Sequence, residues 1–232
     1  MLGQNHVRPS EQNPNLLQIH EIFATIQGEG PFSGWRAVFI RLTGCNLRCW
    51  WCDTVWDDDN DPYKSTSQII TEAMELTREE RPLIVITGGE PVRQDLRQLV
   101  MGLKSRNAIV QIETAGSLWQ SCLRETVIVV SPKTPVLNEN ISDAAAYWKY
   151  PIIAGQTSEK DGLPVTNTQR TSGAKVPLAR PPRGISPHHI FVTPVDLGNE
   201  INNLANTAEV ARIAQQFGYV AQVQLHKLLR VS

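Results

Sequence analysis

Three of the four cysteines lie within eight residues, at Cys45, Cys49 and Cys52, with the spacing C-x3-C-x2-C. Disulfides usually join cysteines that are far apart in the sequence and so close long loops. Clustered thiols are more often metal ligands or redox groups. This segment therefore predicts the binding of a metal ion or of an inorganic cluster.

The cysteine spacing leaves several centres open. A tetrahedral structural zinc needs a fourth ligand, but the remaining thiol, Cys122, falls in or beside a predicted outer helix and the histidines show no zinc-finger spacing. A [4Fe–4S] cluster held by three cysteines leaves one iron open to a further ligand. An electron-carrying cluster, which usually has a fourth local cysteine, and a set of unligated thiols are also compatible with the spacing.

The cysteines follow a predicted strand, 37–42, and so lie at the carboxyl end where α/β proteins place their active sites. Further apolar runs predict strands at 83–86, 109–113, 127–130, 151–153, 189–192 and 219–225. Helical patterns predict helices at 67–79, 94–105, 142–148 and 203–217. Because a complete βα barrel usually needs about 250 residues, the 232-residue chain predicts an α/β fold that is an incomplete TIM-type barrel of about six parallel strands.

Composition and patterning predict one domain over 19–232, preceded by a mobile polar leader over 1–18. Residues 156–188 are rich in Pro and Gly and predict a loop insertion. The 22 Lys and Arg residues nearly balance the 23 Asp and Glu residues, which argues against a nucleic-acid binder. No apolar run is long enough to span a membrane, and no apolar core of a secretory signal is present, so we expect a cytoplasmic protein.

With the aromatic Trp51 before its last cysteine, the cysteine segment resembles the radical S-adenosylmethionine superfamily. The segment Thr87-Gly88-Gly89-Glu90-Pro91, after the second predicted strand, resembles the GGEP motif of that superfamily, which binds the amino group of the methionine. Glycine allows such a close approach of the backbone to a ligand. The resemblance implies a [4Fe–4S] cluster on Cys45, Cys49 and Cys52, with S-adenosylmethionine bound to the fourth iron.

The flanking segments narrow the resemblance to the 7-carboxy-7-deazaguanine synthase family. They are residues 23–30, Cys52-Asp53-Thr54, Ser131-Pro132-Lys133 and His226-Lys227. The family's activity implies that a 5′-deoxyadenosyl radical takes a hydrogen from C6 of 6-carboxy-5,6,7,8-tetrahydropterin. The ring then contracts with loss of ammonia to give 7-carboxy-7-deazaguanine, for queuosine and deazapurine biosynthesis, and S-adenosylmethionine is regenerated.

The family resemblance also implies roles for single residues. Thr54 is implied as a ligand of Mg²⁺, which prefers hard oxygen ligands. The implied contacts to S-adenosylmethionine are Trp51, Cys52, Asp53, Gly89, Ser131, Pro132, Lys133, Thr193, Pro194, Val195 and Asp196, although Thr193 stands where the family usually has Gln. The implied substrate contacts are Ile26, Gln27, Gly28, Glu29, Arg41, Thr87, His226 and the C-terminal Ser232.

Each of these residues also has a structural interpretation when it is taken alone. Arg41 fits an ion pair within an apolar strand, Thr54 and Thr87 fit ordinary turns, and a lone His226 fits a structural role. Their joint order around the cysteine segment favours the functional interpretation.

Two further functions remain open on the sequence alone. One is a radical-generating activase of a glycyl-radical enzyme, and the second is a non-catalytic zinc or iron–sulfur module. Gln27–Gly30 and Cys52-Asp53-Thr54 favour the synthase. The family further implies a small-molecule pterin substrate, an external flavodoxin-like electron donor and a homodimer, without direct contact to nucleic acid or to a membrane.

Overall fold

The structure, a computed structural model, describes residues 5–52, 54, 60–169 and 176–231. Within these residues the strands form one nine-stranded sheet in the order β3-β1-β2-β4-β5-β6-β7-β8-β9. The strands are β1 (Leu16–Ile26), β2 (Arg36–Leu42), β3 (Tyr63–Ser65), β4 (Leu83–Gly88), β5 (Ile109–Thr114), β6 (Val127–Val130), β7 (Tyr147–Ile152), β8 (Ile190–Pro194) and β9 (Val220–Ala221).

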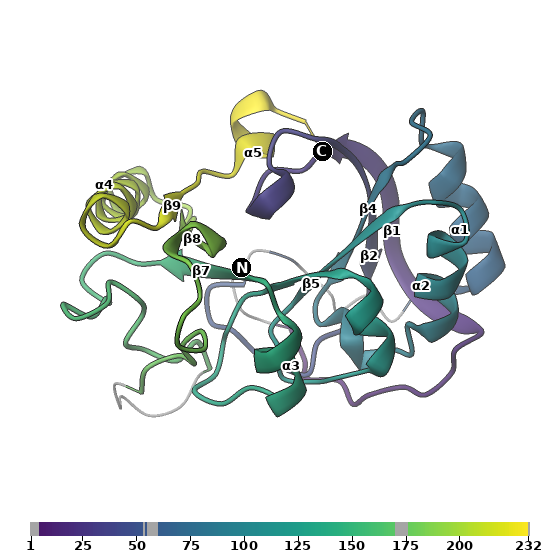
Figure 1. Cartoon of the computed structure of the whole chain (residues 1–232), viewed down its shortest axis with the longest axis horizontal. Coiled ribbons are helices and arrows are strands. Elements are labelled where there is room, and N and C mark those ends of the chain that lie inside the picture. The colour runs from purple at the N-terminus through teal and green to yellow at the C-terminus, as the bar shows by residue number, and fades with distance from the viewer. Residues whose placement is uncertain (1–4, 53, 55–59, 170–175, 232) are drawn as a thin grey trace.

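Neighbouring strands from β2 to β9 are parallel, whereas β1 pairs antiparallel with both β2 and β3. Figure 1 shows the sheet curved around the middle of the molecule, with α1 and α2 outside one end and α4 outside the other. The predicted α/β class is confirmed, and the curved parallel sheet is that of a partial barrel. The helices are α1 (Thr66–Glu75), α2 (Arg97–Lys104), α3 (Glu139–Ala144), α4 (Glu200–Phe217) and α5 (Leu225–Leu229).

The sequence does not predict strands β1 and β3, and two of its predicted elements differ in the structure. The predicted helix 142–148 is instead α3, which stops at Ala144, and the aromatic Tyr147 begins β7. The predicted strand 219–225 is only two residues long. Beyond it, the Gln222 side chain binds the backbone N–H and carbonyl of Gly30, and α5 begins at Leu225.

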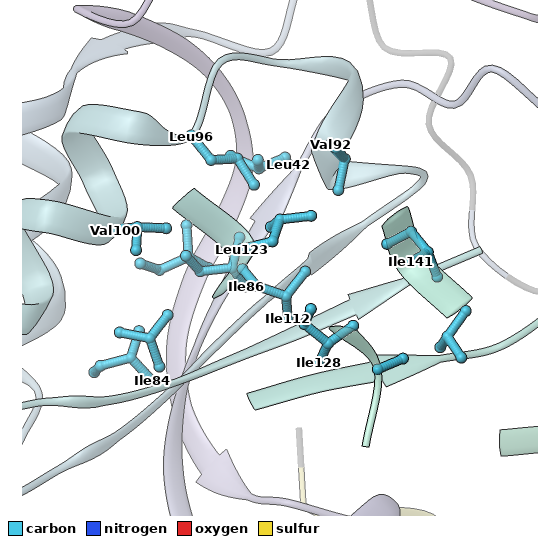
Figure 2. Packing of buried hydrophobic residues seen from close by; sticks show 14 of the residues in the cluster. Leu42, Ile84, Ile86, Val92, Leu96, Val100, Ile112, Leu123, Ile128 and Ile141 are labelled. Atoms are coloured by element: carbon cyan, nitrogen blue, oxygen red, sulfur yellow. The ribbon is translucent and has the colours of Figure 1, made fainter. Parts of the chain in front are cut away.

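The main core lies between the sheet and the helices outside it. Because successive side chains of a strand point to opposite faces, Ile84 and Ile86 of β4 enter this core, whereas Leu83 and Val85 join a small cluster with Ala37 of β2. Figure 2 shows the main core, where labelled side chains of the strands meet those of the outer segments. The inward face of the sheet is therefore left for polar side chains nearer the carboxyl ends of the strands.

The N-terminal segment and the predicted insertion differ from regular βα units. β1 begins at Leu16, three residues before the predicted start of the domain, and the fully buried Arg93 binds the carbonyl of Pro9 and the carboxylate of Glu11. The described part of 156–188 contains no strand or α-helix. Among the described residues, no helix has the length and apolar character that a membrane crossing requires.

Candidate active site

Two adjoining cavities lie at the carboxyl ends of the parallel strands. The first, which we call the cysteine cavity, has a volume of about 230 Å³ and is lined by all three clustered cysteines. The second, the Gln27 cavity, has a volume of about 210 Å³. Both cavities are lined by the same six residues, Glu29, Thr54, Thr87, Gly88, Glu113 and Gln224.

Most of the predicted site residues line one or both of these cavities. Those that line the cysteine cavity are Glu29, Cys45, Cys49, Trp51, Cys52, Thr54, Thr87, Gly89, Ser131, Lys133, Thr193, Pro194, Val195 and Asp196. Those that line the Gln27 cavity are Ile26, Gln27, Glu29, Arg41, Thr54, Thr87 and His226. Gly28 and Pro132 line neither cavity, and Asp53 and Ser232 lie outside the described residues.

The two glycines after β4 allow the cysteine loop to pack directly on the strand end. A Cβ atom on Gly89 would lie 2.3 Å from the carbonyl oxygen of Gly44 and 2.7 Å from the Cβ of Cys45. A Cβ atom on Gly88 would lie 2.2 Å from the carbonyl oxygen of Leu42. Any side chain here would push the loop away, so the glycines set the width of the cavity.

Glu90, the next residue of the same motif, is fully buried and holds two strand ends together. Its carboxylate accepts hydrogen bonds from the Thr114 hydroxyl at 2.7 Å, the Ala115 N–H at 2.7 Å and the Val92 N–H at 3.1 Å. Burial raises the pKa of Glu90. Its contacts give Glu90 a structural role that supports the loop after β4.

Lys133 is one of the cations on the walls of the cysteine cavity. Lys133 donates to the carbonyl and the hydroxyl of Ser131, and its Nζ lies 5.7 Å from the centre of the Trp51 ring. Burial lowers the pKa of Lys133. Asp196, which lines the same cavity, accepts from Lys227 at 2.9 Å, which together with backbone and Asn203 donors lowers its pKa to about 2.

A buried network of charges lies where the two cavities adjoin, with Glu29 and Glu113 lining both cavities and Lys149 lining the cysteine cavity. The Nζ of Lys149 lies 2.8 Å from the Glu29 carboxylate and 2.9 Å from the Glu113 carboxylate. The other oxygen of Glu113 accepts from Gln27 and from Gln111, both at 3.0 Å. Although burial opposes the charged forms, the ion pairs raise the pKa of Lys149 and lower that of Glu113.

Neither Lys149 nor Glu113 was among the residues predicted from the sequence. Lys149 is a cation inside an otherwise apolar and aromatic strand, and Glu113 ends the predicted strand 109–113 at the carboxyl edge. A charge in a buried strand needs a partner, so the sequence does indicate that both residues are paired. The pairing itself joins residues 36 positions apart, which local patterns do not reveal.

Arg41 lies where it can contact the substrate, and it also forms the structural ion pair that the sequence allows. It lines the Gln27 cavity, but its Nε lies 2.8 Å from the Glu21 carboxylate on the antiparallel neighbour β1. Its guanidinium also lies 5.5 Å from the centre of the Phe23 ring. The ion pair and the ring hold the guanidinium at the wall of the cavity.

The C-terminal segment closes the Gln27 cavity. The Leu225 N–H donates to the carbonyl of Gly28 at 3.3 Å, and a Cβ atom on Gly28 would lie 2.2 Å from the Nδ1 of His226. Gly28 therefore acts through its backbone, because its lack of a side chain lets His226 reach the cavity wall. This explains why Gly28 itself lines neither cavity.

Known proteins of similar sequence identify the family of this chain. The profile of the radical SAM superfamily matches residues 39–128. A 7-carboxy-7-deazaguanine synthase of Rhodospirillum rubrum is 41% identical over the full length of both chains, and that of Rickettsia prowazekii is 32% identical over 93% of this chain and 89% of its own. The chain belongs to the 7-carboxy-7-deazaguanine synthase family.

A solved structure agrees with the fold of this synthase family. The crystal structure of QueE from Escherichia coli has a TM-score of 0.66 and 24% sequence identity, and the match covers 91% of this chain and 95% of that one. Family membership favours the synthase over the activase and over the non-catalytic module. The radical SAM superfamily implies a [4Fe–4S] cluster and S-adenosylmethionine as cofactors.

The residues in the cysteine cavity fit the cofactors of this synthase family. Burial, with Glu90 as the next cause, raises the pKa of the Cys45 thiol to about 12. A thiolate in such a place persists when a metal binds it, since a coordinating thiol is deprotonated. No three His, Cys, Asp or Glu side chains among the described residues are grouped to hold a single metal ion. The case for the cluster therefore rests on three thiols that share one cavity.

Proposed function

We propose that this chain converts 6-carboxy-5,6,7,8-tetrahydropterin into 7-carboxy-7-deazaguanine with loss of ammonia. The observation that carries this proposal is the shared wall of the two cavities. The three thiols line the cysteine cavity together with Lys149, and the Glu29 and Glu113 carboxylates that pair with Lys149 line both cavities. A radical formed in the cysteine cavity would meet a substrate in the Gln27 cavity without crossing solvent.

The cofactor would be held by the residues of the cysteine cavity. Cys45, Cys49 and Cys52 would hold the cluster, and the backbone at Gly89 would approach the methionine amino group. When bound, the cluster and S-adenosylmethionine supply a carbon radical that abstracts hydrogen from the substrate. Trp51, Ser131, Lys133 and the turn at 193–196 would contact the remainder of the cofactor.

The pterin would bind in the Gln27 cavity. The Glu29 and Glu113 carboxylates line this cavity and share the single Lys149 ammonium, which leaves one net negative charge in the network and suits the amino and amide N–H groups along one edge of a pterin. Glu29 and Gln27 can receive this edge, with the Gly28 backbone beside them. His226 lines this cavity, and Ser232 is proposed as a further substrate contact.

The substrate carboxylate would lie at the shared wall. Thr54 lines both cavities, and we propose its hydroxyl as a protein ligand to a Mg²⁺ that also binds the substrate carboxylate. Arg41 and Thr87 are register partners on β2 and β4, so they project to the same wall. The Arg41 guanidinium can add a charge-assisted hydrogen bond to the same carboxylate.

Turnover tests the proposed function. The full chain is reconstituted with iron and sulfide without oxygen and incubated with a reductant, S-adenosylmethionine, Mg²⁺ and carboxytetrahydropterin, and products are identified by mass. We expect 7-carboxy-7-deazaguanine, and less of it when Mg²⁺ is chelated. Release of 5′-deoxyadenosine without deazaguanine would contradict the proposal.

The proposed reaction also requires partners. A one-electron donor outside this chain, of the flavodoxin kind, must reduce the cluster, and we expect the enzyme to act in the cytoplasm as a homodimer. The near balance of 22 basic and 23 acidic residues fits an enzyme whose substrate is a small molecule rather than RNA.

A further inference from the structure

Two segments that are distant in sequence contact the sulfur atoms of the cysteine loop. Gln169, in the predicted insertion, forms an antiparallel bridge with Cys49, and its Nε2 lies 3.4 Å from the Cys49 Sγ. In the N-terminal segment, the Nδ2 of Asn5 lies 3.7 Å from the Cys52 Sγ. The sulfur of Cys45 instead receives the Leu47 N–H, at 3.4 Å, from within the loop.

The orientation of both amide groups follows from their other contacts. The Oε1 of Gln169 accepts the backbone N–H of Arg48 at 2.8 Å, which leaves its Nε2 facing Cys49. The Nδ2 of Asn5 also donates to the carbonyl of Thr54 at 2.7 Å, so the N–H end of this amide faces Cys52. Because an amide NH₂ group donates and does not accept, both sulfurs are the acceptors of these hydrogen bonds.

The neighbouring Thr168 is a weaker donor than Gln169. Its Oγ1 lies 3.0 Å from the Cys49 Sγ, but the same hydroxyl also donates to the carbonyl of Lys133 at 2.9 Å. One proton cannot serve both acceptors fully. The Nε2 of Gln169 has two N–H groups, so it can donate to Cys49 and to the Thr168 hydroxyl at 3.0 Å together.

We propose that Gln169, with a smaller contribution from Asn5, is a positioning residue that raises the reduction potential of the cluster through its cysteine ligands. Hydrogen bonds to ligand sulfurs and exclusion of solvent are the protein's means of setting the potential of an iron–sulfur cluster. The reduced cluster carries one more negative charge, so an N–H donor stabilises it more than the oxidised cluster. The inference rests on the proposed placement of the cluster on Cys45, Cys49 and Cys52.

The test compares variants of the full chain, reconstituted without oxygen. Gln169→Leu removes the donor, and Gln169→Glu keeps an acceptor for the Arg48 N–H but turns a carboxylate oxygen toward the sulfur. Thr166→Val is the matched control in the same segment, because its hydroxyl donates to Gln156 at 2.7 Å and not to a cysteine. Iron and sulfide per chain are measured first. The midpoint potential is then measured by redox titration of the electron paramagnetic resonance signal.

We expect Gln169→Leu to keep its iron and to lower the ratio of reduced to oxidised cluster about tenfold at a fixed potential, which is about 59 mV for one electron. Gln169→Glu should shift the potential at least as far, and Thr166→Val should match the unchanged chain. Unchanged potentials in both Gln169 variants would overturn the inference. Loss of the cluster from both would also overturn it, by making Gln169 an assembly residue. An unchanged chain that takes up no cluster would instead refute the proposed cluster site.

Discussion

The cysteine cavity and the Gln27 cavity share a wall but are built by different forces. The cysteine cavity takes its width from close backbone contacts, such as that of Gly89 with Gly44, and the Cys45 thiol on its wall is half-buried. The Gln27 cavity has the Glu29 and Glu113 carboxylates in its lining, and Lys149, which lines the cysteine cavity, pairs with both of them. The three thiols would receive a charged cofactor. The charges of Glu29, Glu113 and Lys149 are already paired with one another before any ligand binds.

This difference predicts two kinds of failure. A change in the cysteine cavity should remove the cofactor and leave the fold intact, because the thiols lie on a loop outside the sheet. A change in the charge network should lower stability and turnover together, since a buried charge that loses its partner is strongly destabilising.

The largest effect should come from the thiols. We expect Cys45→Ala, Cys49→Ala and Cys52→Ala each to abolish turnover and to lose iron, with an unfolding midpoint close to that of the unchanged apoprotein. Iron and sulfide analysis together with urea unfolding checks this. Cys122→Ala, in the outer segment Ser121–Glu125, is the control and should keep both iron and turnover. Activity retained in any of the first three would refute the cluster site.

The next effect should come from Lys149→Met. It leaves the Glu29 and Glu113 carboxylates without their ammonium, so we expect a loss of about 3–5 kcal/mol in the free energy of unfolding and of about a hundredfold in kcat/KM. Lys64→Met is the matched control, since Lys64 pairs with Glu72 at the surface and should cost about 0–1 kcal/mol. Equal effects of the two changes would show that the buried charge network contributes no more than a surface ion pair.

The two cavities also differ in how far the sequence predicts them. The cysteine side consists of short contiguous segments at predicted strand ends, so local spacing predicts its thiols, and the family resemblance of these segments implies Gly89 and Lys133. Lys149 and Gln169 were missed because their partners are distant in sequence and no local pattern pairs them. The partial barrel followed from the βα alternation. The antiparallel β1 did not, since nothing in its own residues specifies that it pairs with β2 and β3.

A smaller effect should come from Gly89→Ala. The new methyl group would meet the Gly44 carbonyl and Cys45, so we expect S-adenosylmethionine to bind about tenfold more weakly, less than the roughly hundredfold cost of a full 1 Å misplacement. Gly155→Ala is the control, because its Cβ would meet nothing within 4 Å and only its positive φ of 75° would be strained. Equal cofactor affinities in the two variants, by calorimetry on the cluster-loaded chain, would contradict the close-packing account.

The smallest effect should be a pH dependence of stability. Burial alone would raise the pKa of Glu113, but the Lys149 ion pair lowers it below its ordinary 4.5. Its stabilisation is therefore present above about pH 4.5 and is lost as the pH falls through the lower folded value. The free energy of unfolding should fall less steeply with acid in Glu113→Gln than in the unchanged chain. Identical slopes between about pH 5 and pH 3 would show that Glu113 gains no such stabilisation.

The central claim is that the two cavities act as one reaction space, and hydrogen transfer tests it most directly. The reconstituted chain is given carboxytetrahydropterin that carries deuterium at C6, and the recovered S-adenosylmethionine and 5′-deoxyadenosine are analysed by mass. If the two cavities form one reaction space, the adenosyl group of the recovered S-adenosylmethionine or 5′-deoxyadenosine should contain deuterium. The labelled substrate should also be converted to the deazaguanine. Deazaguanine formed with no deuterium in either adenosyl product would contradict the account.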